Sequence, residues 1–325
     1  KKNIIQFLTN NIKNLNQMQS ETYIAFINRL INFYLSNKKN TIAYGQNICT
    51  GSSFSGMTRD ILSTGCKVIN SQDSENLLTG IGYGMLLNNQ SSVYFLKQQD
   101  FLFLGLDHMV NSYNLIKLQK KFEKNFFTIF FITVDSGFEG PQSRINKLPS
   151  ISSLTNIKSY CINNQHDAEV IFRNYFSTKG VNLISISQRM FKKAIIRSKY
   201  YKLVDKVNCL IEYSKGSSTL ILSTNFAFIQ AVEFINTINL KEKLTHAHMS
   251  SHNFVKNKKS TNYFSKFKKI IVVNDAKSGD YKLLISLFEI TKKLLYLESS
   301  DDLNNLTPNQ DKFAIDINAI KKFKN

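Results

Sequence analysis

The run FFTIFFITVD at 126–135 constrains the fold of this chain more than any other stretch. It is rich in aromatic and β-branched residues, which favour strands over helices. It is also far too short to cross a membrane as a helix, which takes about 20 apolar residues. We interpret it as a buried strand, which needs neighbouring strands and covering elements around it.

Strand-like and helix-like segments alternate on both sides of this run. Such alternation implies a mostly parallel sheet covered on both faces. A Gly- and Ser-rich loop around 51–56 and the loop SGFEGPQSR at 136–144 interrupt the pattern. The predicted strands are 41–45, 67–71, 93–97, 126–135, 159–162 and 181–186, and the predicted helices are 21–37, one from Glu75, 102–117 and 166–176.

A second unit of the same kind follows. The chain has 325 residues, which suits two domains. Arg and Lys cluster without periodicity near 190–207, which indicates a linker. The predicted strands of this unit are 209–213, 219–224, 269–275 and 294–298, with helices at 226–238 and 281–294 and a closing segment FAIDINAIKKF. We expect an N-terminal extension at 1–20 and two three-layer α/β/α domains with mostly parallel sheets, at 21–195 and 205–325.

The net charge of +19 invites a nucleic-acid function. The lysines, however, are spread through the chain, and no basic and aromatic RNA-binding motif is present. We therefore expect neither nucleic acid nor a membrane as partner. An acidic partner chain is another explanation of the positive net charge. The four cysteines form no CxxC pair, which indicates free thiols in a reducing compartment. A cytoplasmic location is expected, with an organellar matrix as the alternative.

The stretch SENLLTGIGYGML at 74–86 places three glycines inside a helix-like run. Each glycine costs a helix about 1 kcal/mol relative to alanine. The spacing and the position inside the run exclude a dinucleotide-binding loop. Small residues on one face let another backbone approach, so we expect Gly80 and Gly84 to pack against another chain, with Asp73 or Ser74 as the N-cap.

Glu75 lies in the first turn of that helix, directly after a predicted strand. This edge is where open α/β sheets bind ligands. A first-turn glutamate also complements the helix dipole, and on this motif alone that structural role is the more common one.

The order of several segments resembles a known family. GQNI, a Gly/Ser loop with SGMTRDI, and KVINSQDSENLLTGIGYGML are followed by VYFLKQQDFLFLGLDHMVNS, FITVDSGFEGPQS and HDAEVIF. This order resembles the pyrimidine-binding domain of transketolase-like thiamine diphosphate enzymes. It is most similar to the β subunit of 2-oxo acid dehydrogenases such as pyruvate dehydrogenase. TLILST and KIIVVNDAKSGD are similar to their C-terminal domain.

The resemblance implies a role for Glu75. In the family this glutamate contacts N1′ of the cofactor's aminopyrimidine and promotes the imino tautomer that deprotonates the thiazolium carbon. The resemblance also assigns Phe101 to stacking on the pyrimidine, and Lys97 and Gln98 to the cofactor pocket. Core packing is the alternative for Phe101.

The same resemblance exposes an absence. Family members that bind the diphosphate carry GDG and then Asn, which hold Mg²⁺, and no GDG occurs in this sequence. The resemblance therefore implies that a partner chain of α type, or a missing N-terminal part of the same protein, holds the diphosphate and Mg²⁺, while this sequence is expected to contribute no metal ligands. An α2β2 heterotetramer or a β–β dimer contact is expected.

Ser143 stands where relatives carry a histidine that helps proton transfers on substrate-derived groups. We assign Ser143 to the catalytic site, but its identity puts acyl transfer to lipoamide in doubt. His246, His248 and His252 are expected to be surface histidines rather than metal ligands.

Three hypotheses remain open. The first is the β-type half of a split 2-oxo acid dehydrogenase or decarboxylase, and the second is a transketolase C-terminal half that uses a nonstandard acceptor. The third is a noncatalytic structural or regulatory subunit that kept the fold.

Overall fold

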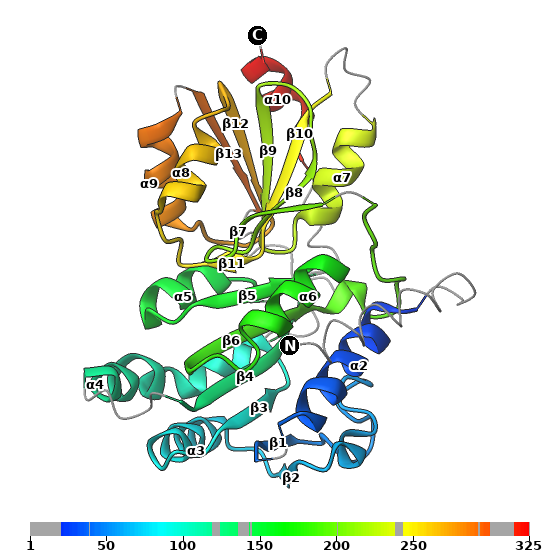
Figure 1. Cartoon of the computed structure of the whole chain (residues 1–325), viewed down its shortest axis with the longest axis vertical. Helices are drawn as coiled ribbons and strands as arrows, with labels where there is room; N and C mark the ends of the chain where they lie inside the picture. Colours follow the sequence, from blue (N-terminus) through cyan, green and yellow to red (C-terminus); the bar gives the residue numbers. More distant parts are fainter. Residues whose placement is uncertain are drawn as a thin grey trace.

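The molecule consists of two units, each built on its own sheet, which lie one above the other in Figure 1. The computed structural model describes residues 21–38, 40–118, 124–135, 143, 145–199, 201–237, 243–291, 293–299 and 315–324. The expected extension at 1–20 and most of the loop 136–144 lie outside the described residues.

The first sheet has the strand order β11-β5-β6-β4-β3-β1-β2. All its pairings are parallel except that of β11 with β5. All eight residues of β4 are buried, as the apolar run at 126–135 predicts. The strands are β1 (Ile42–Gln46), β2 (Lys67–Ser71), β3 (Ser92–Leu96), β4 (Phe126–Thr133), β5 (Ser159–Ile162), β6 (Gly180–Ser187) and β11 (Ser251–His252).

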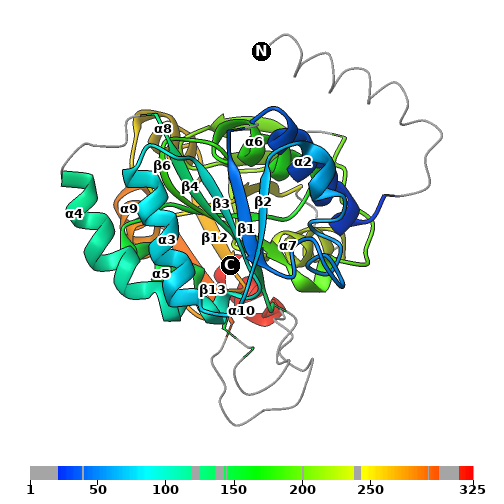
Figure 2. The ribbon, with the colours of Figure 1, turned by 90° about the horizontal axis from the view of Figure 1, so that it is seen from below.

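Helices cover both faces of this sheet. One face packs against α2 (Tyr23–Ser36) and α6 (Gln165–Asn174). The other packs against α3 (Glu75–Leu87), α4 (Tyr113–Leu118) and α5 (Leu148–Thr155). Figure 2, seen from below, shows α2 and α3 on opposite sides of β1. The expected three-layer α/β/α architecture is confirmed.

The second sheet has the order β13-β12-β9-β10-β8-β7; β8 pairs antiparallel with both β7 and β10, and the other pairings are parallel. Helices α8 (Lys258–Phe264) and α9 (Tyr281–Ile290) cover one face, and α7 (Phe228–Thr237) and α10 (Ile317–Lys324) the other. The strands are β7 (Lys202–Asp205), β8 (Leu210–Ser214), β9 (Thr219–Thr224), β10 (Thr245–Met249), β12 (Lys269–Asn274) and β13 (Lys293–Glu298).

The segment predicted as one helix at 102–117 is broken into three. A 3₁₀ helix, η3 (Gln99–Gly105), leads into a π-helical turn, η4 (His108–Ser112), and then into α4. Gly105 lies so close to α3 that a Cβ there would be 2.4 Å from Thr79 Oγ1. The 3₁₀ segment is therefore held tightly against α3.

Several elements are absent from the sequence interpretation: β7, β10, β11, α5 and α8. The largest error concerns β10, the segment THAHM, because a strand between β8 and β9 cannot carry surface histidines. His246, His248 and His252 are all at most 2% exposed, so the expectation of surface histidines is wrong.

The two units share backbone pairing. β11 comes from the second unit by sequence, yet it pairs with β5 of the first sheet. The connecting segment also returns to the start of α2, where Thr22 bridges Ala194 and Ile195 N donates to Glu21 O. We therefore keep the division at 21–195 and 205–325 as a proposal, with β11 as its exception.

The structure explains two of the three helix glycines within the chain itself. A Cβ at Gly82 would lie 2.1 Å from Phe127 Cζ and 2.5 Å from Tyr44 Oη, and a Cβ at Gly80 would lie 2.9 Å from His108 Nε2. A Cβ at Gly84 would meet nothing within 4 Å. The expected packing of Gly80 against another chain is thus wrong, since its own chain already fills that space.

Gly82→Ala should destabilise the isolated chain, whereas Gly84→Ala should stabilise it. Overpacking against buried Phe127 costs about 1–3 kcal/mol, which outweighs the gain in helix propensity. At Gly84 the propensity gain of roughly 0.5–1 kcal/mol stands alone. Urea unfolding of both variants measures the two shifts, and equal shifts would contradict the packing argument.

Candidate functional site

The candidate site begins at the carboxyl end of β2, where α3 starts. Ser74 occupies the N-cap position, although its side chain makes no capping hydrogen bond, and Glu75 is the acidic residue of the first turn. Within the described residues, no hydrogen bond or ion pair engages the Glu75 carboxylate, which is half-buried. The carboxylate is therefore available to a ligand at this edge.

Aromatic rings surround the start of α3. Tyr94 of β3 stacks on Tyr44 of β1 with ring centroids 5.0 Å apart, and Tyr44 Oη donates to Leu78 O at 2.9 Å. Burial raises the pKa of Tyr94, and the nearby charges of Glu75 and Asp73 raise it further. Phe101 is half-buried and packs on the same cluster. A carboxylate and a partly open aromatic ring thus share one edge of the sheet.

Gln98 and Ser143 are brought together. Both side chains are 7% exposed, and Ser143 Oγ donates to Gln98 Oε1 at 2.7 Å. Asp100 Oδ1 accepts from Ile145 N at 3.1 Å, which adds a second contact between the segments that follow β3 and β4. Lys97, by contrast, is exposed.

A buried ion network lies between the two sheets, behind these segments. Arg189, just after β6, contacts Asp135 Oδ2 through Nε at 3.0 Å and Asp275 Oδ2 through Nη2 at 2.8 Å. Asp135 follows β4 and Asp275 follows β12, so the carboxyl ends of both sheets meet here. Burial lowers the pKa of Arg189, but the charges of Asp135 and Asp275 raise it more.

The second unit holds the segment that contains Ser143. Asn146 Nδ2 donates to Asp275 O at 2.9 Å, and Asn225 Nδ2 donates to both Asn146 Oδ1 and Asp275 Oδ1. Sequence reasoning missed Tyr94, Asn146, Arg189 and Asp275. Asp275 could have been found from its position, because it directly follows a buried apolar strand, as Asp135 does in the first unit.

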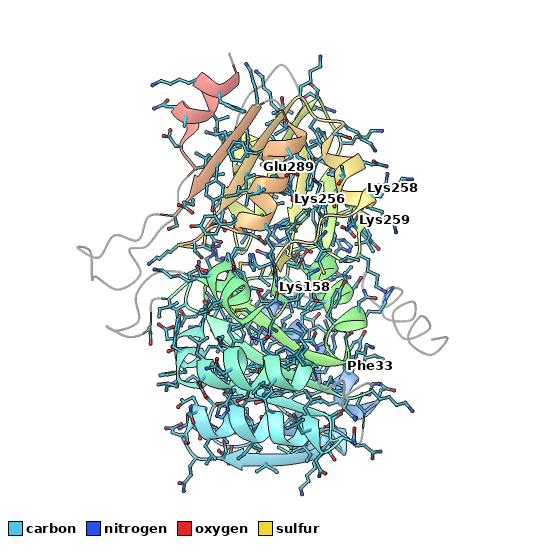
Figure 3. All side chains as sticks on the ribbon, turned by 90° about the vertical axis from the view of Figure 1, so that its left-hand side faces the viewer. Phe33, Lys158, Lys256, Lys258, Lys259 and Glu289 are labelled. Carbon is cyan, nitrogen blue, oxygen red and sulfur yellow. The ribbon has the colours of Figure 1, made fainter. Side chains whose placement is uncertain are left out.

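The basic residues that Figure 3 labels lie in separate places. Figure 3 shows Lys256, Lys258 and Lys259 at the start of α8, where Lys256 pairs with Glu289 of α9. Lys158 lies between the units, and its Nζ donates to Val207 O. In the described part of the chain, no helix has the length and apolar character that a membrane span needs.

Comparison with known proteins supports the fold. No family model and no curated protein matches the chain. Among solved structures, a chain described as "Split gene transketolase, inactive beta4 tetramer" is similar, with a TM-score of 0.63. The match covers 88% of this chain and 90% of that chain, at 9% sequence identity. The fold is transketolase-like. At this identity the likeness concerns the fold alone.

Buried histidines and carboxylates predict how stability depends on pH. Burial lowers the pKa values of His246, His248 and His252 to about 3 and raises those of Asp167 and Asp275 to about 6. Between pH 6.5 and 3 the unfolded chain binds the histidine protons that the folded chain refuses. This lowers stability as pH falls.

Asp167 and Asp275 oppose this trend below about pH 6, because the folded chain binds their protons first, and Asp280, whose pKa burial also raises, acts in the same direction. The histidines begin to lower stability already near pH 6.5 and do so down to pH 3, so they outweigh the carboxylates and the free energy of unfolding should fall as pH drops from 7 to 4. His252→Gln should flatten that slope by about one proton. Urea titrations across this range measure it, and a slope that the substitution leaves unchanged would contradict the assignment.

Proposed function

We propose that this chain is the β-type half of a split thiamine diphosphate-dependent enzyme, of the 2-oxo acid dehydrogenase or decarboxylase kind. The observation that carries the proposal is Glu75, a half-buried carboxylate with no partner among the described residues, at the sheet edge where α3 begins. The similarity in fold to a split-gene transketolase chain supports it.

The described residues suit the aminopyrimidine half of the cofactor. Glu75 would share a proton with N1′, since its carboxylate lies at the open sheet edge beside the aromatic side chains. Phe101 would contact the face of the ring, since its own ring is only partly covered by the cluster around Tyr44 and Tyr94. When bound, the cofactor supplies the carbanion chemistry that protein side chains lack.

Gln98 and Ser143 would border the substrate side of this pocket. Their mutual hydrogen bond fixes both side chains, and the link from Asn146 to Asp275 fixes the segment behind them. The Ser143 hydroxyl can donate or accept a hydrogen bond, but it does not carry a proton as a histidine does. Ser143 would therefore position a substrate oxygen. Lys97 would act, if at all, at the exposed rim.

A partner chain of α type would supply the diphosphate and Mg²⁺ ligands, because this sequence lacks GDG. The face of α3 beside the site supports such a partner. Leu77 is 59% and Ile81 42% exposed, Gly84 is open about one turn after Ile81, and Leu104 of η3 is 53% exposed. Exposed apolar side chains gathered on one helix face next to an incomplete site are typical of a subunit interface. An α2β2 assembly, or a β–β contact within it, would bury this face.

A transketolase-like activity is the second candidate. The similar solved chain is named as part of a split-gene transketolase, which favours a ketose donor over a 2-oxo acid. That chain's β4 assembly is described as inactive. An inactive β-only state would also be expected here, since half of the cofactor site is missing. Thiamine-dependent release of CO₂ from a 2-oxo acid separates the two candidates.

The third reading is a noncatalytic structural or regulatory subunit. Ser143, where relatives carry a histidine, favours it mildly. The presence of Glu75 argues against it. Its carboxylate has no hydrogen-bond or ion-pair partner among the described residues and lies beside aromatic side chains, and a glutamate that only stabilises the start of a helix does not require such neighbours.

Glu75→Gln in the complex with the partner chain tests the proposal. The two side chains are nearly isosteric, so folding and assembly should persist. Gln cannot share a proton with N1′, and exchange of the thiazolium proton should slow by roughly 10²–10⁴-fold, the usual contribution of a general acid–base group. Quenched-flow exchange followed by NMR measures that step without knowledge of the substrate.

Glu289→Gln is the matched control, because Glu289 lies on the surface in an ion pair with Lys256. That variant should exchange the proton as fast as the unaltered complex. If Glu75→Gln does so too, Glu75 only stabilises the start of α3 and the proposed function fails.

A further inference from the structure

A pocket lies between α7 and the segment that connects the two units, away from Glu75. Figure 1 shows that segment passing α7. Its volume is about 310 Å³, at the small end of ligand pockets and suited to one ring with short substituents. Its walls are mainly apolar. The lining side chains used below are Ile196, Arg197, Tyr213, Phe228, Val232 and His246.

His246 gives this pocket a buried polar group. The residue is 2% exposed, and its ring lies 5.3 Å from that of Phe228 and 5.9 Å from that of Tyr213. Its Nε2 lies 2.9 Å from Ser223 Oγ. Among the described residues its other ring nitrogen, Nδ1, has no hydrogen-bond partner, so Nδ1 is the polar atom that the ring offers to the pocket.

Neighbouring hydrogen bonds assign the proton of this ring. Asn163 Nδ2 donates to Asn225 O at 2.8 Å, which fixes its amide orientation, and it also lies 2.9 Å from His248 Nε2. Since an amide nitrogen only donates, His248 Nε2 accepts, and His248 carries its proton on Nδ1. That nitrogen lies 2.9 Å from Ser223 Oγ and donates to it.

The Ser223 hydroxyl then has its own proton to give. Its closest remaining acceptor is His246 Nε2 at 2.9 Å, against 3.4 Å for Ala247 O. His246 therefore carries its proton on Nδ1 and presents an N–H donor to the pocket. Burial lowers its pKa to about 3, so the ring stays neutral at physiological pH.

The mouth of the pocket carries a cation that is only loosely compensated. Arg197 contacts Glu21 Oε2 at 3.5 Å, with 35% of its side chain exposed. Glu21 is already held by Arg29, which donates to both of its oxygens at 3.0 Å. An anion that binds at the mouth can therefore recruit Arg197 without breaking a strong ion pair.

We propose that this pocket binds a small aromatic carboxylate, with its ring between Phe228 and Val232, its carboxylate on Arg197 and a distal oxygen accepting from His246 Nδ1–H. Each part of the ligand would contact one feature of the pocket. The ring would pack on the apolar walls, the carboxylate would pair with the Arg197 guanidinium, and the distal oxygen would accept from the buried N–H of His246. The site is separate from the proposed cofactor site and does not depend on it.

Three probes dissect the recognition by the full chain in calorimetry. We expect 4-hydroxyphenylacetate to bind with a submillimolar Kd. Phenylacetate, which lacks the distal oxygen, and 4-hydroxyphenylethanol, which lacks the charge, should each bind about tenfold more weakly, the effect of one good hydrogen bond or charge contact. If 4-hydroxyphenylacetate does not bind, the proposal is overturned.

Matched variants locate the binding. Arg197→Gln should weaken 4-hydroxyphenylacetate about tenfold, whereas Lys199→Gln, an exposed neighbour outside the pocket, should leave its Kd unchanged. Val232→Phe should fill the pocket and abolish binding. Ile285→Phe, at an exposed position of α9, is its control. Equal affinity in the Arg197 and Val232 variants and the unaltered chain would place the ligand elsewhere and refute the assignment.

Discussion

The buried contact of Arg189 with Asp135 and Asp275 is the constraint on which the arrangement of the two units depends. Each carboxylate follows a central strand of a different sheet, so one guanidinium joins the carboxyl ends of both. A buried charge left without its partner costs about 3–5 kcal/mol. The units therefore cannot separate at this edge without exposing or isolating three charges.

The contacts of Asp275 also position the segment that carries Ser143 at the carboxyl edge of the first sheet. Asp275 does more than pair with Arg189, because Asn146 and Asn225 are anchored on it. Asn146 in turn holds the segment that carries Ser143 against Gln98 and Asp100. The second unit thus acts as a support for the candidate site, although Glu75 and its aromatic neighbours belong entirely to the first. These contacts from the second unit hold the segment with Ser143 in place beside the candidate site.

The sequence predicted the architecture well because its signals are local. The apolar run at 126–135 and the alternation of segments specify a covered, mostly parallel sheet, and the structure has that sheet. The position of Glu75 in the first turn of a helix after a strand was predicted for a similar reason, whereas its role in a site rests on the family resemblance and stays a prediction. The histidines were misplaced because THAHM lacks the apolar character of a buried strand. In the structure His246 and His248 contact Ser223 and Asn163, respectively, and His252 contacts Asn225, and these partners are distant in the sequence.

The glycines show the same limit. Their position inside a helix indicated a close approach, but only the fold reveals that Phe127 and His108 of the same chain are the groups approached at Gly82 and Gly80. At Gly84 a Cβ would meet no described atom within 4 Å, so its packing against another chain stays a prediction. Contacts between residues distant in the sequence leave no pattern in the neighbouring residues. The sequence therefore indicated a close approach at these glycines but not that the approached side chains belong to the same chain.

The central claim is that this chain supplies one half of a cofactor site whose other half lies on a partner. Calorimetry of the purified chain with thiamine diphosphate and Mg²⁺, before and after addition of the co-purified partner, tests it most directly. The account predicts no Mg²⁺-dependent binding by the chain alone and tight binding by the complex. Tight, Mg²⁺-dependent binding by the isolated chain would contradict it.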